Sequence, residues 1–282
     1  MADGMLNEQE LEIVKEVAKE VAKDVYADAG KPIMKPAGEL VGLIPRAIKA
    51  ALEPVEKWVL QREYNVAETK KLLEEKLSNT SPELIESPEP YIAVPALQYI
   101  SYCMDNNELR DMYANLLANS MNKIVKNGVH PGFVEIIKQL SPDEAKVLRH
   151  LAVRKVIPTV TLRYENEKRS GIDVIRNFSN VGEIVKCEYP FEISKYLDNM
   201  IRLGLVKDSG LSSLTDKSRY DNLKTHPHIQ EYLEEETILQ TGYNTPVFKE
   251  GFMTLTDYGK SFCEICLTPI NVITVEIKEN IK

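Results

Sequence analysis

This sequence has few cysteines and lacks the common catalytic motifs. Only four cysteines occur in 282 residues, too few for a disulfide scaffold. The thirteen glycines are scattered rather than gathered in a phosphate-binding loop, and neither a GxSxG nor an HExxH motif is present. We therefore assign no catalytic, cofactor-binding or metal-binding residue and expect no cofactor, although an enzyme of unrecognised type remains open.

Long apolar runs and targeting signals are also missing. The longest uncharged stretch, residues 90–104, is 15 residues long and contains Pro95, whereas a membrane-spanning helix needs roughly 20 apolar residues. The first residues show no basic region followed by an apolar core, so we expect no secretory signal. These absences predict a cytoplasmic protein whose thiols are reduced.

Positive charge is in short supply. Lysine and arginine number 35 against 43 aspartates and glutamates, which gives a net charge of -8. Affinity for a phosphate backbone comes largely from clustered cations, so the composition argues against a non-specific nucleic-acid coat and leaves room only for a local basic patch. The hydrophobic fraction of 43% is that of an ordinary folded protein.

The periodicity predicts a helical domain over residues 1–140. Apolar residues recur every three or four positions across 8–29, opposite charged residues of mixed sign. The stretch 32–52 is rich in small residues, and Gly38 and Gly42 have the spacing that permits close helix approach. We interpret it as a packing segment, with a conditional membrane-inserting segment as the alternative. Further helices are predicted over 54–79, 92–104, 108–125 and 132–139.

A second domain is predicted over residues 141–282. Ser141, Pro142 and Glu144 form a strong helix start, and the adjacent acidic residues Asp143 and Glu144 are expected on a solvated helix face. The elements predicted after this helix are a strand over 156–164, a short helix over 172–178, a helix over 191–203, strands over 205–207 and 252–255, and a closing helix capped by Thr256.

This order of elements resembles a winged helix, a helix-turn-helix relative whose last two strands form the wing. The wording Leu255-Thr256-x-x-Gly259 strengthens the resemblance. The departure is a long wing insertion, residues 209–251, which contains its own acidic helix over 227–240. The expected fold class is therefore mainly α with a small β component: a helical part followed by a winged-helix-like domain.

The helix at 191–203 would be the recognition helix of such a domain. Its two cations, Lys195 and Arg202, are balanced by Glu192 and Asp198. Helices that read DNA present Arg, Lys, Asn or Gln to base edges and need phosphate-binding cations as support. The neutral helix favours a protein-interaction module, with a DNA-binding regulator as the alternative.

One metal-like spacing occurs, Cys263-x-x-Cys266. A structural zinc site needs four ligands, and His226 and His228 could supply the other two, but no fold argument brings them close. The simpler interpretation is that both cysteines are small apolar residues that pack the closing helix. The two other histidines, at 130 and 150, lie beside helix boundaries, where capping and packing explain them.

Two longer segments carry a family resemblance. Residues 108–121, ELRDMYANLLANSM, and residues 130–145, HPGFVEIIKQLSPDEA, are similar to the abortive infection alpha (Abi-alpha) family of bacterial proteins, a domain of unknown function. The resemblance implies anti-phage defence and brings no catalytic or binding residues. Taken together with the neutral helix at 191–203, it leads us to expect action through a protein partner or phage component. Nucleic acid is not favoured, and a membrane or a second copy of the chain stays possible, the membrane through residues 32–52.

The first helix supplies a test of the helical domain. A valine-rich stripe is a poor helix former by itself and needs a packing partner, so we expect Val21→Asp to destabilise the whole protein by several kcal/mol through an unpaired buried charge. Denaturant unfolding of the purified variant measures this. A variant that melts like the parent but loses vesicle binding would instead make this helix an exposed effector surface.

Overall fold

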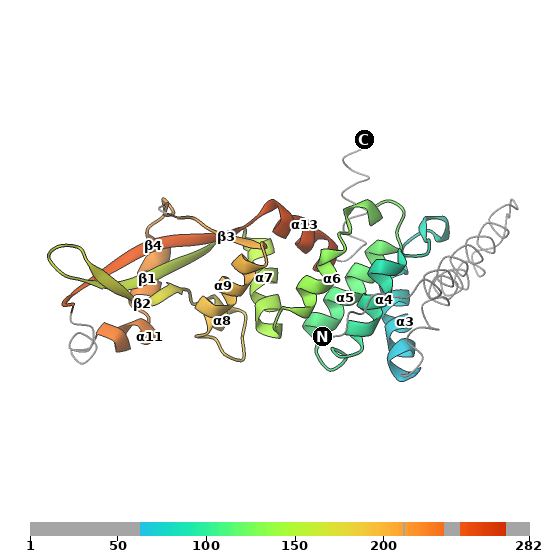
Figure 1. Ribbon diagram of the computed structural model, residues 1–282, viewed down its shortest axis with the longest axis horizontal. Coiled ribbons are helices and arrows are strands. Elements are labelled where there is room, and N and C mark those ends of the chain that lie inside the picture. The colour runs from blue at the N-terminus through green and yellow to red at the C-terminus, as the bar shows by residue number, and fades with distance from the viewer. Residues whose placement is uncertain (1–62, 211, 234–242, 269–282) are drawn as a thin grey trace, which may run out of the picture. The chain divides into compact units, whose positions relative to one another are not determined.

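The computed structural model describes residues 63–210, 212–233 and 243–268. By their contacts these residues form two compact units, the first from 63–139 with 264–268 and the second from 140–263 (Figure 1). The predictions for residues 8–29, 32–52, 54–62 and 234–240 lie outside the described residues.

The first unit is built around one buried helix. Helix α5 (Asn107–Ser120) is buried from Met112 to Ser120 and packs against α3 (Glu63–Leu77), α4 (Pro90–Ile100) and α6 (Gly132–Lys138). Short 3-10 turns occupy Pro82–Leu84 and Lys126–Gly128. The predicted helices are therefore present, with corrected ends.

Helix α5 ends earlier than the predicted 108–125 because its next residues pair with a distant loop. The Met121 carbonyl accepts a hydrogen bond from the Glu86 amide, and the Lys123 amide donates to the Leu84 carbonyl. An isolated β-bridge between Ile85 and Asn122 lies between these two bonds. The backbone groups that would extend the helix are satisfied by this pairing instead.

The end of the described chain belongs to the first unit. The buried Asn115 and Asn119 side chains donate to the carbonyls of Cys266 and Ile265, at 2.9 and 2.7 Å. The sequence-based division at 140/141 assigns these last residues to the second domain, whereas residues from Glu264 group with the first unit. Buried side-chain amides one turn apart on α5 supply the physical reason.

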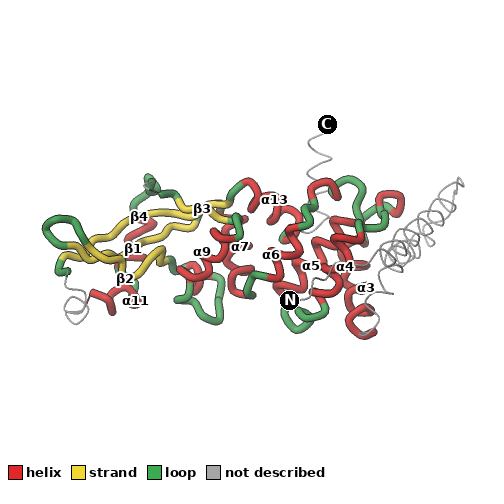
Figure 2. The backbone as a smooth tube through the Cα atoms, in the orientation of Figure 1, coloured by secondary structure: helices red, strands yellow, loops and turns green. Residues whose placement is uncertain are grey.

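The second unit joins helices to an antiparallel sheet whose strand order is β2-β1-β4-β3 (Figure 2). In chain order its elements are α7 (Pro142–Arg154), β1 (Ile157–Glu165), β2 (Gly171–Phe178), α8 (Val181–Ile184), α9 (Ile193–Arg202), β3 (Val206–Asp208), α10 (Ser218–Lys224), α11 (Pro227–Gln230), a 3-10 turn (Glu231–Leu233) and β4 (Thr245–Leu255). They are followed by α13 (Asp257–Cys266), whose last three residues group with the first unit. The two late strands predicted at 205–207 and 252–255, which would form the wing of a winged helix, do pair antiparallel, with Val206 opposite Leu255.

Two predictions for this unit are wrong. Residues 172–178 form strand β2 rather than a short helix, because Val174 and Ile175 pack against the sheet core. Strand β4 begins at Thr245 rather than 252, since its first half pairs with β1 out to Glu165. The described fold is thus helical with a larger sheet component than expected, and a four-stranded sheet does not by itself confirm a winged helix.

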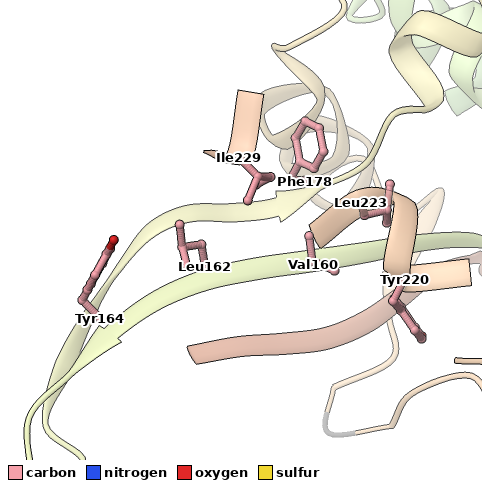
Figure 3. Packing of buried hydrophobic residues seen from close by; sticks show 7 residues of the cluster. All are labelled: Val160, Leu162, Tyr164, Phe178, Tyr220, Leu223 and Ile229. Carbon is pink, nitrogen blue, oxygen red and sulfur yellow. The ribbon is translucent and has the colours of Figure 1, made fainter. Parts of the chain in front are cut away.

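The segment predicted as a wing insertion contributes to the core of the second unit. Tyr220 and Leu223 of α10 and Ile229 of α11 pack over the β1 side chains of Val160 and Leu162 (Figure 3). The predicted acidic helix 227–240 is shorter within the described residues, where α11 gives way to the 3-10 turn. One face of the sheet is therefore covered by this insertion.

The sequence motif Leu-Thr-x-x-Gly has a direct structural explanation. The Thr256 hydroxyl donates to the Gly204 carbonyl and accepts from the Gly259 amide at 2.8 Å, so it caps α13. A Cβ on Gly259 would lie 2.0 Å from the Leu205 carbonyl oxygen. Glycine at this position allows α13 to approach the end of α9 at van der Waals distance.

We expect Gly259→Ala to lower the free energy of unfolding by about 2–4 kcal/mol, because the new methyl group must displace backbone. The matched control is Gly128→Ala, whose Cβ would meet only the Ile265 side chain, at an ordinary 3.5 Å. Urea unfolding of both variants measures the difference. Equal stabilities would contradict the close approach.

Candidate functional site

A buried carboxylate fixes a segment of the second unit that carries exposed large apolar side chains. Asp143, in the first turn of α7, is 5% exposed. Its side chain accepts hydrogen bonds at 3.0 Å from the amides of Glu188 and Tyr189, and at 3.1 Å from the Tyr196 hydroxyl on α9. The Lys146 ammonium group completes the set at 3.0 Å. The loop between α8 and α9 is thereby fixed to α7.

The environment of Asp143 favours its ionised form. Burial alone would raise the pKa of the carboxyl group, but the amides of Tyr189 and Glu188, together with Lys146 and Tyr196, outweigh burial and hold the pKa below its ordinary value. Burial, followed by the hydrogen bond to this carboxylate, also raises the pKa of the Tyr196 hydroxyl.

Its neighbour Glu144 fixes α9 directly. The Glu144 carboxylate accepts from the Ser141 amide at 2.6 Å and from the Asn199 side chain at 2.8 Å, while the Ser141 hydroxyl caps the Glu144 amide. The predicted helix start is confirmed as a capping box. The expectation that this acidic pair lies on a solvated face is wrong, because both carboxylates are buried and bind α9 or the loop before it.

The charged side chains on the exposed face of α9 have partners within the chain. Lys195 lies 3.4 Å from Glu192, and the Arg176 guanidinium from β2 lies 2.9 Å from Asp198. Arg202 donates to the Asn199 side-chain oxygen. A DNA-reading helix needs cations and amides directed at bases and phosphates, and here these groups have partners on the protein.

Three exposed large apolar side chains lie within eight residues of sequence, from the last residue of α8 to two residues before α9. Ile184, Tyr189 and Phe191 are 57, 60 and 48% exposed. The Phe191 ring stacks on His228 of α11, with centroids 4.5 Å apart and planes 12° apart. We call Ile184, Tyr189, Phe191 and His228 the aromatic patch. Aromatic side chains are enriched at the centres of protein interfaces, so this composition is more typical of an interface than of a solvated loop.

A second histidine supports the patch. The His226 Nε2 lies 2.8 Å from the Glu183 carboxylate, and its Nδ1 accepts from the His228 amide. Its ring contacts Phe178 and Phe191, with centroid distances of 5.0 and 6.1 Å. His226 therefore ties α11 to the α8 side of the patch rather than standing free.

A polar hollow of about 450 Å³ lies on the sheet face opposite the hydrophobic core, beside α9. Thr159 and Thr161 line it because successive strand side chains alternate between faces. Its charged groups have partners on the protein: Lys249 lies 3.9 Å from Asp173, Arg176 lies 2.9 Å from Asp198, and the Asp208 carboxylate accepts from the Gly210 amide. The hollow can admit a polar ligand but presents no nucleophile paired with a base.

The structure places the cysteines and the other two histidines that the sequence analysis considered as possible ligands or caps. Cys263 and Cys266 are buried in α13, and the described part of the chain contains no group of three or more His, Cys, Asp or Glu residues able to hold a metal ion. His130 accepts from the Gly132 amide at the start of α6. Burial, followed by the charge of Arg154, lowers the pKa of His150.

Sequence reasoning missed Asp143, Tyr189 and Phe191. The Ser-Pro-Asp-Glu start of α7 was the available signal for Asp143, since a carboxylate in a first helical turn often binds nearby amides.

Within the described ranges, no helix combines the length and apolar composition that crossing a bilayer requires.

Comparisons with known proteins identify one family. The family model described as abortive infection alpha matches residues 61–266. No curated protein matches the chain. A solved structure, that of an uncharacterized protein from the hydrocarbon-degrading marine bacterium Alcanivorax borkumensis SK2, is 18% identical over 48% of this chain and 92% of that chain, with a TM-score of 0.36.

We expect Asp143→Asn to lower the free energy of unfolding at neutral pH by about 3 kcal/mol, because the amide cannot accept all four hydrogen bonds and carries no charge. Asp105→Asn, an exposed aspartate before α5, is the matched control and should change stability by less than about 0.5 kcal/mol. Denaturant unfolding provides the measurement.

The same variant should alter the acid response. Since folding lowers the pKa of Asp143, its stabilisation is fully present above the ordinary value of 3.8 and disappears as pH falls through the lower folded-state value. The stability difference between parent and Asp143→Asn should therefore narrow below pH 3.8. A difference that stays constant down to acid unfolding would contradict this role.

Proposed function

The chain belongs to the abortive infection alpha family, and from this premise we propose that it is a bacterial anti-phage protein that acts in the cytoplasm through contacts with another protein. The match to residues 61–266 carries the proposal, because it covers most of the described residues of both units. An infected cell in which this protein is triggered stops growing or dies before phage progeny are released.

Several features support protein contact over nucleic-acid contact. The chain is acidic, with a net charge of -8, and the cations of α9 have partners on the protein. The aromatic patch is exposed and held in place by Asp143. A protein-binding surface needs exposed aromatic anchors on a rigid support, whereas duplex binding needs clustered, available cations.

The finer proposal is that the second unit is a winged-helix-like module used for protein interaction. Its support is the antiparallel order β1-β4-β3 together with α7 and α9, which precede β3 in the chain. The hairpin of β1 and β2 and the insertion with α10 and α11 would then be additions to that module. In this proposal α9 supports the exposed segment that precedes it, which contacts the partner, and α9 does not enter a DNA groove.

A phage challenge tests the function. Cells that express the parent chain should release at least tenfold fewer progeny per infected cell than cells with an empty vector, and should stop growing when every cell is infected. Gly128→Ala should protect like the parent, whereas Gly259→Val, which forces a large side chain against Leu205, should not protect. Unchanged progeny over several unrelated phages would overturn the proposed role.

The mode of action has its own test. The purified full chain should show no salt-sensitive, sequence-specific duplex binding at roughly 10 nM or tighter, the affinity expected of specific regulators. Duplex binding of that strength that disappears in Lys195→Ala/Arg202→Ala would establish a DNA-binding regulator instead. Dye release from anionic vesicles by the full chain would establish a membrane-perturbing effector.

A further inference from the structure

We infer that the aromatic patch docks a segment of a partner protein that carries apolar side chains flanked by lysine or arginine. The inference deepens the proposed function, on which it rests for its biological setting, by naming the surface and the chemistry of its partner. Three observations carry it: the exposure of the patch, its fixed backbone, and the charge of its surroundings.

The exposure is concentrated. Ile184, Tyr189 and Phe191 lie within eight residues of one another, and each is about half exposed or more. Large apolar side chains scattered singly on a surface need no explanation, but here three of them share one short segment, and Phe191 stacks on His228 of a second element. Aromatic residues at such a site bury a large area with few rotatable bonds, so they dominate binding energy where they occur.

The backbone under the patch is fixed before any partner arrives. The amide of Tyr189 itself donates to the Asp143 carboxylate, and the Tyr189 carbonyl accepts from the Tyr196 hydroxyl at 3.2 Å. Gly182 of α8 lies so close to Pro190 that a Cβ there would be 2.3 Å from the Pro190 carbonyl oxygen. Both ends of the loop are thus held, which reduces the entropy lost on docking.

Acidic groups surround the patch. Glu183, Glu188 and Glu192 are exposed on the same segment, and Glu231 is 70% exposed and 3.7 Å from His228. Three ammonium groups lie here: those of Lys186 and Lys195, the second paired with Glu192, and that of Lys146, which binds the Lys186 carbonyl and the Asp143 carboxylate. Carboxylates therefore outnumber ammonium groups around the apolar centre.

The negative charge around the aromatic patch favours some binding partners over others. A basic segment gains attraction at the rim and buries its apolar side chains at the centre. Duplex DNA and an anionic membrane meet repulsion from the same carboxylates, and a second copy would place acidic rim against acidic rim in a two-fold contact. A basic, apolar protein segment is the occupant that satisfies both the apolar centre and the acidic rim.

A pair of synthetic peptides tests the inference on the full chain. Both are fluorescein-labelled, 16 residues long, and share the same leucines and phenylalanines, but one carries lysine and the other glutamate at every remaining position. Fluorescence anisotropy should show at least tenfold tighter binding of the lysine peptide, and the preference should weaken as salt rises, because rim charges are screened.

Substitutions then locate the site. Tyr189→Ala, with Phe191→Ala as a second variant, should weaken binding of the lysine peptide at least tenfold. Tyr91→Ala is the matched control, since Tyr91 of α4 is equally exposed, at 61%, and binding should be unchanged. Glu188→Lys/Glu192→Lys should reverse the preference toward the glutamate peptide, whereas Glu74→Lys/Glu75→Lys on the exposed side of α3 should not. Thermal melts confirm that each variant is folded.

The contrary outcomes are distinct. Equal binding of the two peptides, or unchanged binding to a folded Tyr189→Ala chain, would overturn the docking site. Displacement of the lysine peptide by a short DNA duplex or by anionic vesicles in a Tyr189-dependent manner would assign the patch to those ligands, and Tyr189-dependent self-association in sedimentation would assign it to a second copy. Peptide binding without phage protection would overturn the proposed function alone, and protection that survives in folded Tyr189→Ala would overturn this inference alone.

Discussion

The second unit depends on one buried charge, the carboxylate of Asp143. An ionised group away from water is strongly unfavourable unless its partners are supplied by the fold, and the partners of Asp143 come from α7, the α8–α9 loop and α9. The loop and helix can take this arrangement only together with the first turn of α7. Satisfying one carboxylate therefore fixes the exposed segment that we propose as the interaction surface.

Local signals in the sequence were sufficient for much of the fold. The capping box at Ser141 and the cap at Thr256 involve residues three positions apart, and the order of helices and strands predicted the pairing of β3 with β4. Strand β2 was missed because its ladder with β1 is interrupted by irregular register around Ile175, and the alternation that begins with Ile172 and Asp173 is broken at Ile175 and Arg176. Periodicity cannot reveal a strand whose alternation is broken by a bulge.

The candidate surface was less predictable for a related reason. Three of the four partners of Asp143 lie 45, 46 and 53 positions away in the chain, so the local sequence places Asp143 at a helix start but does not show that its carboxylate is buried. Phe191 opens the segment that leads into α9 and is indistinguishable by pattern from a core residue. What the sequence did supply was the neutral charge of α9, and the structure adds that its two cations, Lys195 and Arg202, contact the side chains of Glu192 and Asn199.

The hydrogen bonds from Asn115 and Asn119 to the last turn of α13 make the first unit discontinuous in sequence, with the second unit inserted between its two segments. During synthesis, α5 leaves the ribosome long before residues 265 and 266 exist. The two asparagine amides, buried in the finished protein, must remain hydrated or find temporary partners until the whole second unit has been made. Completion of the first unit is thus a late event in biosynthesis. A nascent chain that stops within the second unit lacks the last turn of α13, so the site on α5 that binds this turn stays unfilled.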